Sequence, residues 1–227
     1  MAELIVALDH ADPADAIALL DLLPERAPVK VGAVLLARAG IGFVRGLVTD
    51  GHPVFLDPKW HDIPNTVSGA VSAAAALGVD MITVHALGGE AMLRAAVAAA
   101  AGRTRIIAVT VLTSHSAAEF AAITGRNHVD PGEEVVRLAG IAAAAGVTGV
   151  VCSPHEIPLV RGLTGLDRIV VPGIRREGDA AGDQQRVATP ATAIAAGATH
   201  LVVGRPITGA ADPAAAYQAF AGAIRGT

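Results

Sequence analysis

Short apolar runs alternate with longer Ala- and Leu-rich segments along the whole chain. Apart from the first, the apolar runs are continuous rather than alternating, as in strands of a parallel sheet that is covered on both faces. The predicted strands are residues 4–8, 29–31, 54–56, 81–85, 105–111, 147–152, 168–171 and 200–203. A segment with helical spacing follows each strand. The predicted helices are residues 13–23, 34–50, 67–77, 90–101, 131–145, 157–163, 190–196 and 213–225.

Capping residues and glycines mark the ends of several of these helices. Asp12, Thr189 and Asp212 each precede a proline, which places a capping side chain before a proline at the first helical position. Four glycines stand where a helix should end in a left-handed residue. These are Gly78, Gly102, Gly146 and Gly197.

Eight β/α units in 227 residues predict the α/β class, as a (β/α)8 TIM barrel in a single domain spanning residues 1–227. A doubly wound open sheet is the main alternative. That fold would place a Gly-rich turn after the first strand, but residues 8–13 read Leu-Asp-His-Ala-Asp-Pro. Gly40 and Gly42 lie within a predicted helix and lack the third glycine of a dinucleotide-binding turn. The pattern therefore favours the barrel.

Composition and charge exclude several other classes of protein. The net charge of −4 gives no electrostatic reason to expect nucleic acid as a partner. Cys152 is the only cysteine, so an intramolecular disulfide is impossible and a reducing compartment is expected. The mean hydropathy is +0.52, but the uncharged stretch 138–154 is broken by glycines and is shorter than the ~20 apolar residues of a membrane-spanning helix. The first strand is interrupted by Asp9 and has no basic lead, so we expect no signal peptide and a cytoplasmic protein without membrane association.

Candidate functional residues gather at one end of the predicted strands. In a (β/α)8 barrel the active site lies at the carboxyl ends of the strands, where the loops that follow them meet. These ends carry Asp9, Lys30, Asp57, Lys59, His85, Thr113, Ser153, Arg175, Gly204 and Arg205. The opposite ends have fewer polar and charged residues and carry Glu3, Pro28, Pro53 and Asp80. This asymmetry predicts a site at one mouth of the barrel.

Two carboxylates and two amines at neighbouring strand ends could form an alternating network. Asp57 and Lys59 point to the same side if their strand continues, which would hold an acid–base lysine beside a carboxylate. A structural ion pair at the barrel rim is the alternative interpretation. Lys30 and Asp9 supply the second pair of charges. Asp62 lies a few residues beyond the strand, so its place at the same mouth stays open.

A phosphate site is predicted at the last two strands. Gly204 and Arg205 follow the final strand, where an exposed backbone N–H and a guanidinium suit a phosphate dianion. The connection after the seventh strand is long, and we expect its residues, about 173–189, to form a mobile loop that closes over a ligand. Arg175 and Gln184 lie on this loop. The alternatives are a merely solvated loop and an arginine that neutralises an acid at the rim.

A metal or cofactor site is not predicted. His61, His85 and His155 show no spacing typical of a metal centre, and no carboxylate–histidine cluster accompanies them. Cys152 is most simply a small buried strand residue, because no nucleophile motif surrounds it.

Residues 55–66, which read Phe-Leu-Asp-Pro-Lys-Trp-His-Asp-Ile-Pro-Asn-Thr, closely resemble the signature of the orotidine 5′-monophosphate decarboxylase family. The resemblance extends along the whole chain through shorter pieces in the same order. These are residues 7–9, 29–32, 84–86, 88–89, 111–114, 172–175, 182–184 and 202–208. Each short piece is weak evidence alone, whereas their order around the long motif is specific.

The resemblance implies a homodimeric barrel that converts orotidine 5′-monophosphate to UMP and carbon dioxide in pyrimidine biosynthesis, without a cofactor or a metal. By matching motif, Lys59 would protonate C6 of the pyrimidine as the carboxylate departs. Asp57 would lie against the substrate carboxylate. Lys30, with Asp9, would hold the charge network and the ribose.

The same resemblance assigns the remaining candidates. Asp62 and Thr66 would reach into the active site of the partner subunit, and Thr113 would contact the pyrimidine. Four residues would bind the phosphate under the closing loop. These are Arg175, Gln184, Gly204 and Arg205. Two positions depart from the usual family pattern, namely Pro58 in place of an aliphatic residue and Trp60 in place of a frequent Phe, and we expect activity to survive both.

Two rival functions share parts of this pattern. The sugar-phosphate decarboxylases and hexulose-phosphate synthases resemble magnesium enzymes that carry a glutamate near the end of the second strand, where this chain has Lys30. A non-catalytic binder of nucleotide phosphates on the same barrel would be expected to lack Asp57 or Lys59, and both are present. The sequence therefore favours metal-independent decarboxylation.

Overall fold

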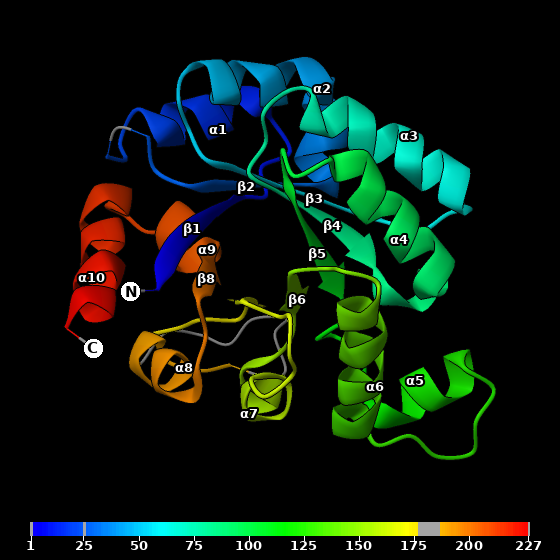
Figure 1. The fold of residues 1–227 in the computed structure, drawn as a ribbon. Coiled ribbons are helices and arrows are strands. Elements are labelled where there is room, and N and C mark those ends of the chain that lie inside the picture. The colour runs from blue at the N-terminus through cyan, green and yellow to red at the C-terminus, as the bar shows by residue number, and fades with distance from the viewer. Residues whose placement is uncertain (1, 25, 177–186, 227) are drawn as a thin grey trace.

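The computed structural model describes residues 2–24, 26–176 and 187–226 and contains a closed barrel of parallel strands (Figure 1). Each strand pairs with the next in chain order, and β1 also pairs with β8, which closes the barrel. The strands are β1 Glu3–Leu8, β2 Val29–Gly32, β3 Val54–Trp60, β4 Met81–His85, β5 Arg105–Val109, β6 Gly149–Val151, β7 Arg168–Val171 and β8 His200–Val203. The predicted (β/α)8 barrel is thus confirmed, and the open-sheet alternative is wrong.

Helices connect the strands and cover the outside of the barrel (Figure 1). The α-helices are α1 Pro13–Leu20, α2 Ala33–Thr49, α3 Pro64–Ala75, α4 Gly89–Ala100, α5 Ala117–Ile123, α6 Pro131–Ala144, α7 Ile157–Val160, α8 Pro190–Ala196, α9 Arg205–Thr208 and α10 Pro213–Arg225. Two short 3-10 helices are η1 Ala86–Gly88 and η2 Pro154–Glu156. Within the described residues, no helix combines the length and the apolar character needed to cross a membrane.

The helix ends follow the predicted signals. The carboxylates of Asp12 and Asp212 accept hydrogen bonds of 2.9 Å from the backbone N–H groups of Ala14 and Ala215, and Thr189 caps α8 in the same way. All four glycines predicted to end helices have positive φ angles, between 70° and 120°. These local signals hold because a cap depends on neighbouring residues rather than on the tertiary fold.

The boundaries of some elements differ from the sequence prediction. β3 continues to Trp60, whereas the apolar run predicted an end at residue 56, because Trp60 pairs again with Val84 of β4 after a register shift. α5 was not expected. Its start carries a capping box in which Ser116 accepts from the backbone N–H of Glu119 at 3.2 Å while the Glu119 carboxylate accepts from Ser116, a signal that the sequence contains.

Alternation along the strands separates the outer core from the barrel interior. Val29 and Val31 of β2 pack toward the helices, so Lys30 between them faces inward. Ala7 of β1 and Phe55 of β3 belong to the small inner cluster that fills the barrel. Two positions further along these strands, Asp9 and Asp57 face the same interior space. The apolar interior therefore ends in a charged layer at the carboxyl ends of the strands.

Candidate active site

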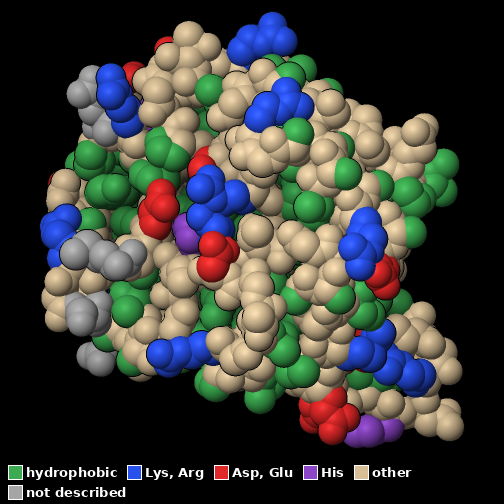
Figure 2. Space-filling model, in the orientation of Figure 1, with side chains coloured by type: hydrophobic (Ala, Val, Ile, Leu, Met, Phe, Trp, Pro, Cys, Tyr) green, Lys and Arg blue, Asp and Glu red, His purple; other side chains and the backbone are tan. Residues whose placement is uncertain are grey.

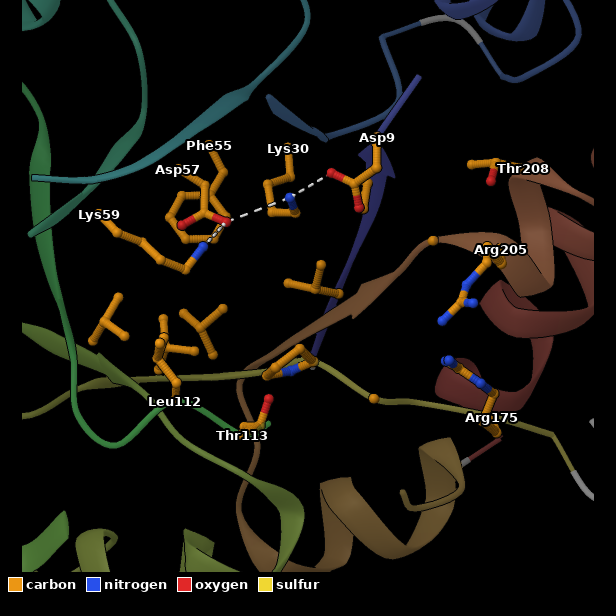
Figure 3. Close-up of a pocket in the computed structure, with 18 of the residues that line it drawn as sticks. Asp9, Lys30, Phe55, Asp57, Lys59, Leu112, Thr113, Arg175, Arg205 and Thr208 are labelled. Atoms are coloured by element: carbon orange, nitrogen blue, oxygen red, sulfur yellow. Dashed lines mark hydrogen bonds and ion pairs between the residues drawn. The ribbon is translucent and has the colours of Figure 1, made fainter. Parts of the chain in front are cut away.

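A cavity of about 450 Å³ opens at the carboxyl ends of the strands (Figure 3). Its floor is apolar and consists of inner-core residues, including Ala7, Phe55 and Val202. Its walls are polar and come from several different loops and strand ends. The polar lining residues are Asp9, His10, Lys30, Asp57, Lys59, Thr113, Arg175, Arg205 and Thr208. The volume suits a drug-sized ligand, since ligand pockets usually enclose roughly 300–1,000 Å³.

Four charged side chains form a row of alternating sign along one wall of the cavity (Figure 3). Lys59 Nζ lies 2.8 Å from Asp57 Oδ2. Lys30 Nζ lies 3.4 Å from the same oxygen and 3.0 Å from Asp9 Oδ1. The order along the wall is therefore ammonium, carboxylate, ammonium, carboxylate. This is the alternating network that the strand-end pattern predicted.

The parallel register of three strands brings this row together. Lys30 of β2 lies beside Ala7 of β1, and Gly32 of β2 lies beside Asp57 of β3. Because side chains on one face recur every second residue, Lys30 lies between the inward-facing ends of both neighbouring strands. Close packing also excludes bulk at this point, since a Cβ on Gly32 would lie 3.0 Å from Lys30 Nζ.

Lys30 stays charged although it is buried. Burial alone would lower the pKa of its ammonium group, because desolvation penalises the charged form. The negative charges of Asp57 and Asp9, and their hydrogen bonds, outweigh that effect and raise the pKa above its ordinary value. The lysine therefore serves as a fixed positive charge between two carboxylates. A divalent cation at the same place would be repelled by it.

Lys59 is held in an unusual backbone conformation at the end of β3. Its φ angle is 52°, in the left-handed region that few residues other than glycine adopt. Its side chain is 40% exposed, and its ammonium group faces the cavity (Figure 3). Pro58 stands between Asp57 and Lys59 in the sequence, where the family usually has an aliphatic residue. It does not prevent their charged groups from forming an ion pair, with Lys59 Nζ 2.8 Å from Asp57 Oδ2.

Two arginines lie on a different side of the cavity from Lys59 (Figure 3). Arg175 follows β7, is 8% exposed, and donates from Nη1 to the carbonyl of Ile174 at 2.8 Å. Arg205 follows Gly204 at the end of β8, and both residues line the cavity. Leu112 and Thr113 line the cavity on the side opposite the charged row (Figure 3). The cavity thus has the charged row along one wall and two guanidinium groups in another part.

The long connection after β7 is only partly described. Its two ends are held together, because Arg175 N donates to Ala188 O at 2.9 Å and Ile174 forms an isolated bridge with Ala188. Gln184, and most of the expected mobile loop at about 173–189, lie outside the described residues.

Asp62 and Thr66 do not line the cavity with the other candidates. Asp62 follows β3, and its Oδ1 accepts from the N–H of Ile63 at 2.6 Å. Thr66 lies in the first turn of α3, and both side chains are exposed. Ile63 between them is 66% exposed and is one of several large apolar side chains on the surface.

The histidines considered as metal ligands do not form a metal centre. The rings of His61 and His85 stack with centroids 5.5 Å apart, while His155 lies in η2. The part of the chain that the structure describes contains no group of three or more His, Cys, Asp or Glu side chains suited to a metal ion. Burial, together with the positive charges of His61 and Lys59, lowers the pKa of His85 to about 4. Cys152 is buried, as expected.

Sequence reasoning missed Thr83, His10 and Thr208. Thr83 contacts both Asp57 and Lys59, as described below. Its signal in the sequence is a single polar residue inside the apolar run of residues 81–85, but a buried threonine has many structural explanations. His10 and Thr208 line the cavity beside residues that were identified.

The fold and the site define a class of protein, namely a (β/α)8-barrel enzyme whose mouth combines a row of alternating charges with two arginines elsewhere on the cavity wall. Residues 2–220 match the model of the Orotidine 5'-phosphate decarboxylase / HUMPS family, and the chain belongs to this family.

Named relatives and solved structures agree with this assignment. The chain is 57% identical, over 228 residues, to an orotidine 5'-phosphate decarboxylase of Halorhodospira halophila, covering 97% of this chain and 95% of that protein. It is 47% identical to the enzyme of the same name from Vibrio parahaemolyticus, covering 96% and 95%. The crystal structure of orotidine 5'-phosphate decarboxylase from Lactobacillus acidophilus is similar, with a TM-score of 0.88, 36% identity and 99% coverage of both chains.

Proposed function

We propose that this protein is an orotidine 5′-phosphate decarboxylase, which converts orotidine 5′-monophosphate to UMP and carbon dioxide in cytoplasmic pyrimidine biosynthesis. The observation that carries the proposal is the alternating row of Lys59, Asp57, Lys30 and Asp9 along one wall of a cavity. The substrate has a carboxylate at one end and a phosphate at the other. The cavity offers ammonium groups near one end and two arginines elsewhere along its wall. Relatives at 47% to 57% identity carry the same enzyme name.

The proposed chemistry is direct decarboxylation with proton transfer from Lys59. The bond between C6 and the carboxylate carbon breaks, and its electron pair stays on C6 while carbon dioxide leaves. No ring carbonyl can delocalise this electron pair directly. The Lys59 ammonium stabilises the developing charge and then donates a proton, which forms the C6–H bond of UMP. The resulting amine recovers a proton from solvent.

Asp57 and Lys30 hold the proton donor in place. Asp57 Oδ2 lies within 2.8 Å of Lys59 Nζ, so the ammonium cannot swing freely through the cavity. Lys30 lies between Asp57 and Asp9, and its positive charge offsets the electrostatic repulsion between the two carboxylates. In this proposal Asp57 lies against the substrate carboxylate, and Lys30 and Asp9 contact the ribose.

The phosphate would be bound at the arginine end of the cavity. Arg175 and Arg205 supply guanidinium groups, and Gly204 supplies a backbone N–H. Gln184 would join them when the loop at about 173–189 closes over the substrate. Contacts to a phosphate remote from C6 can favour the closed arrangement and so contribute to the rate rather than only to affinity. Thr113, which lines the cavity opposite the charged row, would contact the pyrimidine.

We also propose a homodimer in which Asp62 and Thr66 complete the site of the partner subunit. The exposed position of both side chains, away from their own cavity, supports this arrangement. A mixture of Asp62→Ala and Lys59→Ala chains should then regain part of the lost activity through hybrid sites. Failure to regain activity despite confirmed subunit exchange would contradict a shared site.

No metal or cofactor is part of the proposed mechanism. The rival magnesium-dependent reaction of hexulose-phosphate synthases would need a carboxylate at the end of β2, where Lys30 lies 3.0 Å from Asp9 and 3.4 Å from Asp57. Its ammonium group occupies the space between the carboxylates that a cation would need. Decarboxylation without a metal is therefore the function that this geometry supports best.

The direct test follows the ultraviolet absorbance of the pyrimidine when purified protein is mixed with orotidine 5′-monophosphate in the presence of a chelator. We expect rapid conversion to UMP with release of carbon dioxide. No spectral change with correctly folded protein would overturn the proposed activity, and conversion that stops when the chelator is added would overturn its independence of metals.

A further inference from the structure

One hydroxyl group joins the two central residues of the charged row. Thr83, in the middle of β4, is fully buried and does not itself line the cavity. Its Oγ1 donates to Asp57 Oδ1 at 2.9 Å and accepts from the backbone N–H of Lys59 at 2.9 Å. A carboxylate only accepts and a hydroxyl has one proton, so the direction of both hydrogen bonds is determined.

The irregular pairing of β3 with β4 explains why this hydroxyl is needed. Leu56 pairs with Ile82 and Trp60 pairs with Val84, so three residues of β3 face the single residue Thr83. Pro58 in this stretch has no N–H. Lys59 lies within this irregular stretch and has a positive φ angle, and its N–H donates to the Thr83 hydroxyl instead of a backbone carbonyl. The Thr83 side chain therefore provides the partner of this N–H.

The same hydroxyl determines how the Asp57 carboxylate is oriented. Both lysines form ion pairs with Oδ2 of Asp57, with Lys59 Nζ at 2.8 Å and Lys30 Nζ at 3.4 Å. Oδ1 receives the hydrogen bond from Thr83. Contacts to both oxygens fix the plane of the carboxylate, whereas contacts to Oδ2 alone would let it turn about its Cβ–Cγ bond. The position of Lys59 Nζ depends on that plane.

We propose that Thr83 is a positioning residue for the decarboxylation. It acts through Asp57 and Lys59, holding the carboxylate at one end and the lysine backbone at the other, so that the ammonium group is aimed into the cavity. This inference rests on the proposed function. It assigns a role in the rate of the chemical step and none in binding the phosphate, since Thr83 lies outside the cavity and the arginines belong to other strands.

The test compares Thr83→Val, which keeps the shape of the side chain and removes the hydroxyl, with the wild-type enzyme. We expect kcat to fall about 10²-fold, as for a misplacement of reacting groups by about 1 Å. KM and the affinity for UMP should change little, because phosphate recognition is untouched. Thr83→Ser, which restores the hydroxyl, should recover most of the rate.

Thr110 offers a matched control. It is also fully buried at the neighbouring strand end, and its hydroxyl donates to the backbone carbonyl of Val151 at 2.9 Å, away from the charged row. Thr110→Val therefore removes the same group from a similar environment. We expect it to lower thermal stability without a comparable loss of kcat. Equal kcat values for Thr83→Val and Thr110→Val would overturn the proposal.

A second pair of variants keeps the test decisive if Thr83→Val does not fold. The side chains in Thr83→Ser and Thr83→Cys have the same number of heavy atoms, but the thiol is a weak donor and acceptor. The serine variant should keep most of its rate, and the cysteine variant should lose it. Similar rates would overturn the positioning role. Wild-type protein that turns over substrate while Thr83 variants are unaffected would refute only this inference, whereas inactive wild-type protein would refute the proposed function as well.

Discussion

The two ends of the barrel both carry charged side chains, but they arrange them differently. At the mouth, Asp57 is shared by two lysines and the row borders a cavity of about 450 Å³. At the amino-terminal ends of the strands, charges meet in pairs, such as Arg105 with Asp80 at 3.2 Å and Arg168 with Asp167 at 2.7 Å. A crevice at this end, bordered by the starts of β1 to β4, has no room for a water molecule.

Electrostatics separates the two ends in the same way. The pKa of Lys30 at the mouth is raised, because two carboxylates outweigh the cost of burial. At the opposite end, burial and the charge of Asp80 raise the pKa of Glu3, and burial and the charge of Arg168 lower the pKa of His200. Glu3 and His200 are 3.5 Å apart, yet both shifts disfavour their charged forms, so we regard this contact as a weak ion pair. Proximity of charges alone therefore does not mark a functional site.

Charged residues elsewhere on the surface support this view. On the face seen in Figure 2, the described acidic and basic side chains are interspersed rather than gathered by sign. Such a distribution is typical of ordinary solvated surface and does not resemble a nucleic-acid footprint. Among the described residues, buried Glu134 is also shared by two arginines, whereas the shared carboxylate at the mouth, Asp57, in addition lines a cavity.

The largest expected difference between the two ends concerns turnover. Lys59→Ala should lower kcat by at least about 10⁴-fold, since it removes both the proton donor and the charge that stabilises the carbanion. UMP should still bind, because the arginines remain. Arg105→Ala at the opposite end is the control and should keep wild-type kcat. The absorbance assay measures both, and unchanged turnover in Lys59→Ala would mean that another group is the proton donor.

A smaller effect is expected at the arginine end of the mouth. Arg205→Ala should lower kcat/KM for orotidine 5′-monophosphate about 10- to 100-fold, the worth of one charge-assisted hydrogen-bonding group. Turnover of orotidine, which lacks the phosphate, should be unaffected by the same change. An equal loss with both substrates would show that Arg205 supports the fold rather than the phosphate.

The next effect in size should appear as a pH dependence of stability that arises from His85. The pKa of His85 is about 4 in the folded protein and about 6.5 when unfolded, so the unfolded chain binds the proton first. Stability from this group is complete above pH 6.5 and is lost as the pH falls toward 4. Protonation would also remove the acceptor Nδ1 that receives the N–H of Leu87.

Urea unfolding at a series of pH values measures this effect. His85→Asn, which keeps an acceptor but cannot titrate, should lose less stability than the wild type between pH 6.5 and 4. If the free energy of unfolding fell equally with pH in both proteins, the assignment of this effect to His85 would be wrong.

The smallest effect is expected for an ion pair at the amino-terminal end. Arg105→Gln should change the free energy of unfolding by less than about 1 kcal/mol, because both members of its pair with Asp80 are largely exposed and are screened by salt. The difference should shrink further at high ionic strength. A loss of several kcal/mol would show that this end of the barrel is more tightly coupled than its geometry indicates.

Much of the site could be located from the sequence because strand ends share one mouth. The apolar runs marked the strands, and the polar residues within or just after them include Asp9, Lys30 and Asp57, which the structure places around one cavity. Asp62 and Thr66 lie outside that cavity. The family resemblance implies that they reach into the active site of a partner subunit, and this role remains a prediction. Thr83 could not be recognised from the sequence. Its hydroxyl contacts Asp57 and Lys59 only because β4 pairs with β3 in the folded barrel.

The sequence by itself determined the class of fold, the helix caps and the set of charged groups at the mouth. These depend on periodicity and on neighbouring residues, which are local properties of the chain. The tertiary structure alone decided that Asp57 is shared by two lysines and that Lys59 takes a left-handed backbone. It also decided that a hydroxyl from β4 supports both residues. Those features follow from the register between strands, and register is set by packing among residues that are distant in sequence.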